Sequence, residues 1–293
     1  MPIVVITGCS SGIGYEAALR FARSGNTVYA TMRNLAKAGP LKAAAEAEGL
    51  DVRIHQLDVD SQASIDGAVK AIVADAGQID VLVNNAGVTG IGSVEETTDT
   101  ELHAAMETNF FGPLRLIRAV VPAMRERESG TIVNVSSVAG RLVGGACVAY
   151  HSSKWALECA SETLAMELRP FGVRVAIVEP GFFRTPILDK AADGFRAQET
   201  SPYKDLISRM SALYAGASEA SGDPAVVAAT IENAVSTGEP RLRYLVGDDA
   251  EPFVGGRARL TDEEYQTLGD RMTDEEWWAK FFEFFPQPVA AAG

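Results

Sequence analysis

Seven short runs rich in valine and isoleucine recur along the chain, and a longer, alanine-rich stretch separates most of them from the next. The runs are apolar at almost every position rather than at alternate positions, which is typical of strands covered on both faces. Strands that alternate with helices form a parallel sheet. The pattern therefore predicts a doubly wound α/β domain with helices on both faces of a parallel seven-stranded sheet, whose strands lie at residues 3–7, 27–31, 52–57, 79–83, 131–135, 173–178 and 242–246.

Composition and charge limit what such a domain does. The chain has 293 residues, of which 47% are hydrophobic, enough for a large core without a disulfide or metal staple. Its net charge of −13 argues against nucleic-acid binding, which requires basic side chains that neutralise phosphates. No apolar run approaches the roughly 20 residues that span a bilayer. The three cysteines have no CxxC spacing, so we expect a soluble, cytoplasmic protein in a reducing compartment.

A glycine-rich turn, TGCSSGIG, follows the first run directly and opens a predicted helix. Glycines let the backbone approach a pyrophosphate closely, and the helix N-terminus offers free N–H groups and partial positive charge. The spacing differs from the common Gly-x-Gly-x-x-Gly pattern, and no lysine follows to make a P-loop. The turn predicts a dinucleotide site, although it also suits tight strand-to-helix packing. The binding residues are expected to be Gly8, Ser10, Ser11, Gly12, Ile13 and Gly14.

The end of the second run indicates which dinucleotide binds. An acidic side chain there would bond the ribose 2′-hydroxyl of NAD, but the chain has Met32 followed by Arg33. A guanidinium suits a 2′-phosphate, and the Ser11 hydroxyl adds a donor. We therefore predict NADP(H), with Arg33 as a plain surface charge as the alternative.

A tyrosine and a lysine stand four positions apart in the helical stretch AYHSSKWALE, residues 149–158. Side chains at i and i+4 are neighbours on a helix, so Tyr150 and Lys154 point to one spot. An ammonium at about 4 Å contributes on the order of 4 kcal/mol, or roughly three pK units, to ionisation of a phenol. We therefore expect Lys154 to bring the pKa of Tyr150 from about 10 to near 7, where a general acid/base works best.

Two serines follow the fifth run, at the strand end where ligands of open α/β sheets bind. The hydroxyl of Ser136 or Ser137 would hydrogen-bond a substrate oxygen, although serines there also satisfy local backbone groups. A serine hydrolase is disfavoured, because there is no Gly-x-Ser-x-Gly elbow and His151 points about 100° away from Tyr150 on a helix. The other histidines have no metal-ligand spacing, so no metal site is predicted.

Together these motifs resemble those of the short-chain dehydrogenase/reductase family over nearly the whole first 185 residues. The shared stretches are, in order, TGCSSGIG, LDVDS, NNAG, ETNFFG, NVSSVAG, YHSSK and PGFFRT. The resemblance implies a Rossmann fold and hydride transfer between a nicotinamide and a carbonyl or alcohol. The most similar branch contains NADP-dependent 17β-hydroxysteroid dehydrogenases and related retinoid enzymes.

The functional residues of the family carry over to the matching positions of this chain. The resemblance implies that Tyr150 is the acid/base, that Ser137 holds the substrate oxygen and that Lys154 also binds the nicotinamide ribose. Asn109 would support a water in the proton relay. In related enzymes the helices that carry Asn109 and Tyr150 pair across a dimer, so a homodimer is expected. The cofactor would further contact Asp58, Val59, Asn85, Ala86, Gly87, Pro180, Gly181 and Thr185.

The chain is expected to divide into a main domain, which contains the substrate pocket, and a C-terminal extension. We assign residues 1–247 to the dinucleotide-binding and catalytic domain, 182–222 within it to a lid, and 248–293 to an acidic, aromatic extension. Aromatic residues recur every four positions from Trp277, so a helix there has an apolar face that packs on its own domain or on a neighbouring subunit. The pocket wall, unless these side chains only pack the lid down, is Thr89, Ile91, Arg141, Leu142, Val143, Phe182, Phe183, Leu188, Phe195, Tyr203, Met210, Leu213 and Tyr214.

Such walls suit a hydrophobic ketone or secondary alcohol, whether steroid-like, retinoid-like or aromatic. The predicted activity is that of an NADP(H)-dependent carbonyl reductase or alcohol dehydrogenase. One alternative is an NAD(H)-dependent alcohol dehydrogenase of the same family, and another is a non-catalytic dinucleotide sensor, which would not need a complete set of proton-transfer residues. A third, an epimerase or dehydratase, usually has a larger C-terminal domain than this extension.

Overall fold

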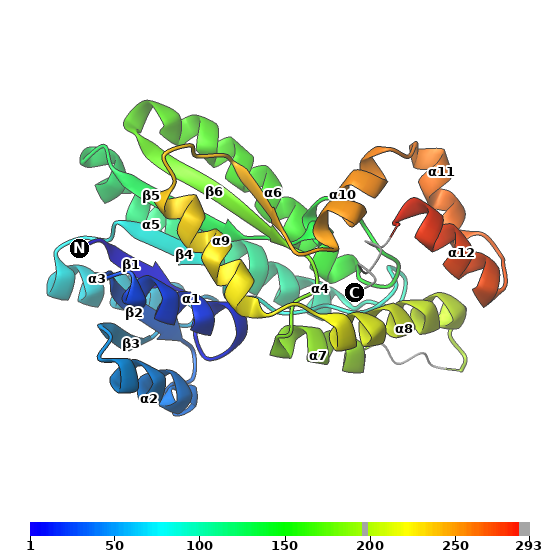
Figure 1. Cartoon of the computed structure of the whole chain (residues 1–293), viewed down its shortest axis with the longest axis horizontal. Helices are drawn as coiled ribbons and strands as arrows, with labels where there is room; N and C mark the ends of the chain where they lie inside the picture. The colour runs from blue at the N-terminus through cyan, green and yellow to red at the C-terminus, as the bar shows by residue number, and fades with distance from the viewer. Residues whose placement is uncertain (195–198, 287–293) are drawn as a thin grey trace, which may run out of the picture.

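A single parallel sheet forms the centre of the molecule (Figure 1). The computed structural model describes residues 1–194 and 199–286. Its seven strands follow the order β3-β2-β1-β4-β5-β6-β7, and every pair is parallel. The predicted fold class is therefore confirmed. The strands are β1 (Ile3–Ile6), β2 (Thr27–Met32), β3 (Val52–Gln56), β4 (Val81–Asn84), β5 (Gly130–Val135), β6 (Val173–Pro180) and β7 (Arg243–Val246).

Helices cover both faces of the sheet. In β1, the side chains of Val4 and Ile6 enter one core layer and that of Val5 enters the other, because side chains alternate along a strand. All three are essentially inaccessible to solvent, which explains the continuously apolar run. One layer contains α1 (Gly12–Arg23), α2 (Gly39–Glu48) and α9 (Pro224–Ser236), and the other contains α3 (Gln62–Ala76), α5 (Gly112–Glu126) and α6 (Val148–Leu168).

The strand order reverses between β1 and β4. From β1 the chain passes through β2 to β3, then returns to β4 on the other side of β1 and continues to β7. A reversal of this kind leaves a crevice at the carboxyl ends of the two central strands. The glycine turn follows β1 and the NNAG stretch follows β4, so the fold brings both motifs to this crevice.

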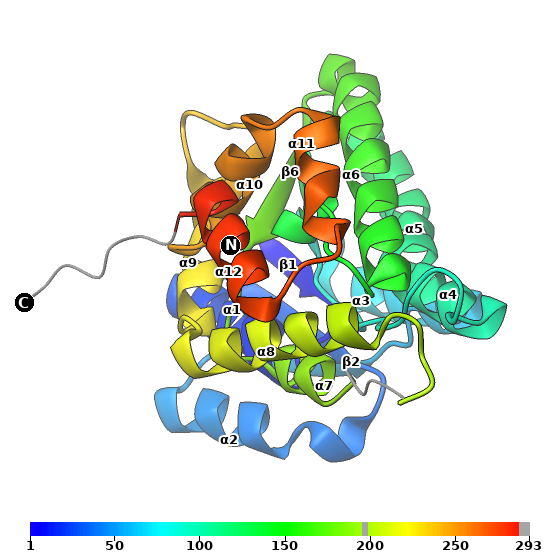
Figure 2. The ribbon, with the colours of Figure 1, turned by 90° about the vertical axis from the view of Figure 1, so that its right-hand side faces the viewer.

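Helices from two separate segments lie beyond the carboxyl ends of the strands (Figure 2). The segment 182–222, which departs from the strand–helix alternation, contains α7 (Pro186–Gly194) and α8 (Lys204–Ala220). The extension contains α10 (Ala250–Ala258), α11 (Asp262–Gln266) and α12 (Asp274–Phe284). A further helix, α4 (Asp99–Met106), precedes α5.

The acidic residues of the extension have a local structural role. The sequence Thr-Asp-Glu-Glu occurs twice, and each copy begins a helix with a capping box, Thr261 with Glu264 and Thr273 with Glu276. In each box the threonine side chain accepts a hydrogen bond from the glutamate N–H, and the glutamate carboxylate accepts one from the threonine N–H. Carboxylates in the first turn also favour the positive end of the helix dipole.

The apolar face of α12 packs against the protein's own chain. Trp277, Phe281 and Phe285 are almost fully buried and form a cluster with Val138 and Leu142, which follow the two serines. The extension therefore covers the segment next to the serines. Among the described residues, no helix is both long and apolar enough to cross a membrane.

Candidate active site

A large cavity lies at the carboxyl end of the sheet. Its volume is about 1490 Å³, above the roughly 300–1,000 Å³ of common small-molecule sites, which leaves room for a cofactor and a substrate together. The lining comes from the glycine turn, the ends of β2, β4, β5 and β6, the helices α6, α7 and α8, and the C-terminal extension.

The glycine turn forms one wall of this cavity. Gly8 and Gly12 have φ angles of +74° and +60°, which L-residues rarely adopt. A Cβ at Gly8 would lie 2.9 Å from the Ala86 Cα, and one at Gly12 would lie 3.0 Å from the Thr185 side chain. Glycine is therefore required at both positions, where the turn packs closely on the residues after β4 and on Thr185. The turn lies at the start of α1, where a dinucleotide pyrophosphate would bind. Ser10, Ser11 and Ile13 line the cavity beside them.

Gly14 has a different role from the rest of the turn. It does not line the cavity, in contrast to the expected cofactor contact. A Cβ there would lie 2.5 Å from both Asn85 Nδ2 and the Gly8 carbonyl oxygen. Gly14 therefore allows the helix α1 to pack closely on the turn and on the residues after β4.

The NNAG stretch is fastened to the glycine turn by Thr7. The Thr7 hydroxyl accepts hydrogen bonds from the backbone N–H of Asn85 (2.9 Å) and Ala86 (3.0 Å). The Asn85 side-chain amide donates to the Thr7 carbonyl at 2.8 Å. Asn85, Ala86 and Gly87 all line the cavity as expected.

Basic residues line the cavity at the end of β2. Arg33 is exposed and forms an ion pair with Asp60 at 3.7 Å. Lys37, which the sequence analysis missed, also lines the cavity, from a short 3₁₀-helix at Leu35–Lys37. Asp58 and Val59 line the same cavity, and the Asp58 carboxylate accepts a hydrogen bond from Asp60 N.

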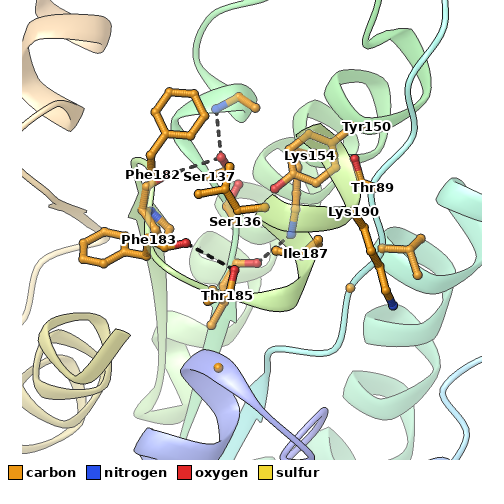
Figure 3. A pocket seen from close by; sticks show the side chains of 18 of the residues that line it. Thr89, Ser136, Ser137, Tyr150, Lys154, Phe182, Phe183, Thr185, Ile187 and Lys190 are labelled. Carbon is orange, nitrogen blue, oxygen red and sulfur yellow. Dashed lines mark hydrogen bonds between the residues drawn. The ribbon is translucent and has the colours of Figure 1, made fainter. Parts of the chain in front are cut away.

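Ser137, Tyr150 and Lys154 line the cavity together (Figure 3). Ser137 begins a 3₁₀-helix at Val138–Gly140, and its hydroxyl accepts from Ala139 N at 3.1 Å and donates to the Pro180 carbonyl at 3.4 Å. Pro180, Gly181 and Thr185 belong to the lining as well. The fold therefore places β5, α6 and the stretch after β6 around one point.

The electrostatics at Tyr150 differ from the expectation. Burial raises the pKa of Tyr150 above its usual value, and the Ser137 hydroxyl opposes this rise. The Lys154 Nζ lies 5.7 Å from the centre of the tyrosine ring and donates to the Val135 carbonyl at 2.9 Å. This direction is opposite to the prediction that Lys154 brings the phenol near pH 7, because burial raises the pKa and the contact that opposes the rise comes from the Ser137 hydroxyl rather than from the ammonium. Burial also lowers the pKa of Lys154 to about 8, while the Glu158 charge opposes that change.

Asn109 supports the cavity from behind. It lies in a π-helical turn, Glu107–Phe111, between α4 and α5, and it is buried outside the cavity lining. Its Oδ1 accepts from Val88 N at 2.8 Å, and its Nδ2 donates to the Val88 carbonyl and to the Ser153 hydroxyl, each at 2.9 Å. The side chain thus holds the chain after β4 against α6, and its contact with a water of the proton relay stays a prediction.

The wall predicted to contact the substrate, called the far wall below, contains only some of the residues that the sequence predicts there. Ile91, Arg141 and Tyr203 are not in the lining, and Phe195 lies outside the described residues. The structure adds residues of the extension to this wall. The four-residue spacing of the aromatic residues indicated only that one face of a helix in the extension is buried. The predicted wall residues that do line the cavity are Thr89, Leu142, Val143, Phe182, Phe183, Leu188, Met210, Leu213 and Tyr214, and the added ones include Phe253, Tyr265, Leu268, Phe281 and Phe285.

Arg141 instead belongs to a buried charge cluster behind the serines. The Glu179 carboxylate, fully buried at the end of β6, pairs with Arg141 at 3.1 Å and with Arg243 at 3.3 Å. Arg243 also pairs with Glu158 of α6 at 3.2 Å. Burial and the nearby Glu158 raise the pKa of Glu179 to about 7, against the two arginines.

Comparison with known proteins shows the same family along most of the chain. The family model described as short chain dehydrogenase matches residues 2–194. The chain is 38% identical to bovine (Bos taurus) retinol dehydrogenase 8 over 87% of its length and 84% of that protein. It is 35% identical to rat (Rattus norvegicus) estradiol 17-beta-dehydrogenase 1 over 83% of its length and 72% of that protein.

Among solved structures of similar fold, some contain NAD and others NADP. A short chain dehydrogenase/reductase from Burkholderia phymatum in complex with NAD has a TM-score of 0.77 and 26% identity, covering 93% of this chain and 96% of that one. A metagenomic short-chain oxidoreductase in complex with NADP has a TM-score of 0.68 and 27% identity, covering 84% and 96%. On the sequence match, the fold and the cavity geometry, the chain belongs to the short chain dehydrogenase family of nicotinamide-dependent oxidoreductases.

Proposed function

We propose that the protein transfers a hydride between NADP(H) and the carbonyl carbon of a bulky hydrophobic ketone, or the matching secondary alcohol. One observation carries the proposal: Ser137, Tyr150 and Lys154 line the same cavity as the glycine turn. A dinucleotide on the turn therefore shares one space with the side chains that act on the substrate oxygen.

The residues divide the proton chemistry between them. In the direction of reduction, the nicotinamide supplies a hydride to the carbonyl carbon when it is bound. Tyr150 donates its phenolic proton to the carbonyl oxygen, which the Ser137 hydroxyl holds by a hydrogen bond. Because burial raises the Tyr150 pKa, the phenol carries this proton at neutral pH. Lys154 would bind the nicotinamide ribose through its ammonium, and the substrate leaves as the alcohol.

Positive charge at the end of β2 supports NADP(H) as the cofactor. Arg33 and Lys37 line the cavity there, and the Ser11 hydroxyl lies in the lining of the neighbouring glycine turn. Arg33 and Lys37 would both pair with the 2′-phosphate of NADP(H), a group that NAD lacks. In a chain with net charge −13, local cations of this kind are needed to hold an anionic cofactor.

The far wall supports a large, apolar substrate. Aromatic and aliphatic side chains of α8, α10 and α12 line it, including Met210, Phe253 and Phe281. The names of the bovine and rat relatives point to retinol and estradiol. We include steroid-like, retinoid-like and aromatic compounds in the proposed substrate class.

A cytoplasmic homodimer is part of the proposal. The cysteines Cys9, Cys147 and Cys159 are all free, as in a reducing compartment. On the outer face of α6, Trp155 and Met166 are 48% and 67% exposed, and such apolar side chains favour a subunit contact. Light scattering after size exclusion measures the mass, and a monomer at micromolar concentration would reject the dimer.

The function is tested by following NADPH absorbance with a panel of steroid, retinoid and aromatic ketones. We expect turnover that depends on a bulky ketone and that is lost in Tyr150→Phe. A protein that binds NADPH but consumes none with any ketone or alcohol would instead be a dinucleotide sensor. The same panel with NADH separates the proposed enzyme from an NAD(H)-dependent alcohol dehydrogenase.

A further inference from the structure

A buried arginine joins the two segments that form the far wall of the cavity. Arg209, on α8, is only 9% exposed. Its Nε donates to the Asp274 carboxylate at 2.8 Å, and its Nη2 donates to the Met272 carbonyl at 2.7 Å. Both partners belong to the extension, at the N-terminal end of α12. Figure 2 shows α8 and α12 side by side.

The same guanidinium contacts the aromatic cluster behind the wall. It lies 5.8 Å from the centre of a Trp277 ring, within the range of a cation–π contact. Trp277 in turn stacks on Phe281, with ring centres 5.1 Å apart and planes at 17°. Phe281 lines the cavity, and so does Met210, the neighbour of Arg209 on α8. One charged group thus links wall residues that come from two segments.

A buried guanidinium is held firmly only while its partners are present. Loss of one partner of a buried charge is costly, because the remaining charge must be solvated or moved. Asp274 is itself 77% exposed, so its carboxylate reaches inward from the surface to meet the arginine. The ion pair therefore joins α8 to the start of α12 at the surface of the molecule.

We propose that Arg209 is a positioning residue that clamps α8 to α12 and thereby sets how large an apolar substrate the cavity binds productively. The inference rests on the proposed hydride transfer and deepens it. Without the clamp, α8 is held to the extension by apolar contacts such as that of Leu213 with the aromatic cluster, and the far wall is less rigid. Small ketones, which need only Ser137 and Tyr150, do not depend on that wall.

The wall that Arg209 holds also favours a neutral substrate. The residues that the described part of the extension contributes to the lining include no charged side chain. Around them the extension carries many acidic residues, including Glu275 and Glu276 of α12 and Glu263 and Glu264 of α11. An end group that meets this part of the wall finds no ionic partner, so the wall that the extension contributes favours an uncharged end group.

The kinetic test compares Arg209→Gln and Arg209→Lys with the wild type on a series of neutral ketones of increasing size. We expect Arg209→Gln to raise KM about tenfold for the largest ketones, a loss of about 1.4 kcal/mol. The kcat, the KM for the smallest ketones and the NADPH dissociation constant should each change less than twofold. Arg209→Lys, which keeps the charge, should recover part of the loss. Arg23→Gln, which removes an exposed ion pair with Glu48 far from the wall, is the control.

Equal changes in KM for small and large ketones, or no change, would overturn the clamp. A second measurement separates this failure from failure of the proposed function. Trypsin cleaves after Arg271, which is exposed and adjoins Met272, the residue whose carbonyl Arg209 holds. Arg209→Gln should speed cleavage at Arg271 at least fivefold, even if the wild type reduces no ketone. If the rate at that bond is unchanged, the clamp is wrong whatever the activity.

Discussion

The ammonium nitrogen of Lys154 lies 5.7 Å from the centre of the Tyr150 ring and donates to a backbone carbonyl at the end of β5. The lysine is thus fixed to the strand end rather than to the phenolic oxygen, and burial dominates the pKa of the tyrosine. A tyrosine with a raised pKa is a ready proton donor at neutral pH, but it becomes a base only at higher pH.

Ketone reduction and alcohol oxidation should therefore depend differently on pH. Reduction needs the neutral phenol, so its single-turnover rate should be level between about pH 6 and 7.5. Oxidation needs the phenolate, so its rate should rise about tenfold per pH unit over that range. Tyr150→Phe should lower both rates by about 10²–10⁴-fold and leave NADPH binding within twofold. An oxidation rate that levels off near pH 7 would instead support the prediction from the sequence that Lys154 lowers the pKa of Tyr150 to near 7.

Removal of the two cations at the end of β2 should change the choice of cofactor. We expect Arg33→Ala with Lys37→Ala to raise the KM for NADPH tenfold or more, since two charge-assisted contacts to a phosphate are lost. The KM for NADH should change less than twofold. Steady-state kinetics with both cofactors measure the ratio, and Arg20→Ala, which breaks only an exposed pair with Glu232, serves as the control. If the ratio of the two KM values is unchanged, Arg33 and Lys37 do not select NADP(H).

Glu179 should make the protein less stable as pH rises. Its pKa in the folded protein is raised to about 7 from an ordinary value of 4.5. Between these values the folded state binds more protons at Glu179 than the unfolded state does. The contribution of Glu179 to the free energy of unfolding therefore falls from about pH 4.5 to pH 7 and is constant on either side. Glu179→Gln cannot titrate, so it should lack this fall, and its Tm relative to wild type should increase between pH 5 and 8.

A neighbouring glutamate provides the control for that experiment. Glu162 pairs with the same Arg243 but is exposed, and the arginine lowers its pKa. Its stabilising effect is present above about pH 4.5 and is lost only in more acidic solution, so the Tm of Glu162→Gln relative to wild type should stay constant between pH 5 and 8. Parallel Tm curves for all three proteins would show that Glu179 does not titrate in this range.

Gly14→Ala should disturb the cofactor site without touching the cavity. The new Cβ would lie 2.5 Å from the Gly8 carbonyl, in a turn whose glycines have little freedom to shift. Overpacking of this kind costs about 1–3 kcal/mol, and the displaced turn should also weaken NADPH binding. Gly67→Ala is the matched control, because a Cβ there meets nothing within 4 Å and a helix prefers alanine by about 0.5–1 kcal/mol. Chemical denaturation and NADPH titration measure the two effects.

The sequence was most informative where a local pattern determines the structure. The seven strands lie within one or two residues of the predicted runs, because burial on both faces requires apolar side chains at every position. The turn residues Gly8 and Gly12 were also found from the sequence, since their positive φ angles leave little choice but glycine. The four-residue spacing of Trp277, Phe281 and Phe285 indicated a buried helix face, but not the partner that buries it.

What the sequence determined by itself was the fold class, the dinucleotide turn and the helical neighbours Tyr150 and Lys154, because periodicity, backbone angles and helix spacing act over a few residues. What only the tertiary structure decided was the direction of the Tyr150 pKa, the backbone contacts of Asn109, the charge cluster around Glu179 and the clamp between Arg209 and Asp274. Each of these depends on burial and on through-space contacts between separate elements of the chain. Desolvation and charge pairing act over distances in space, which the order of residues does not specify.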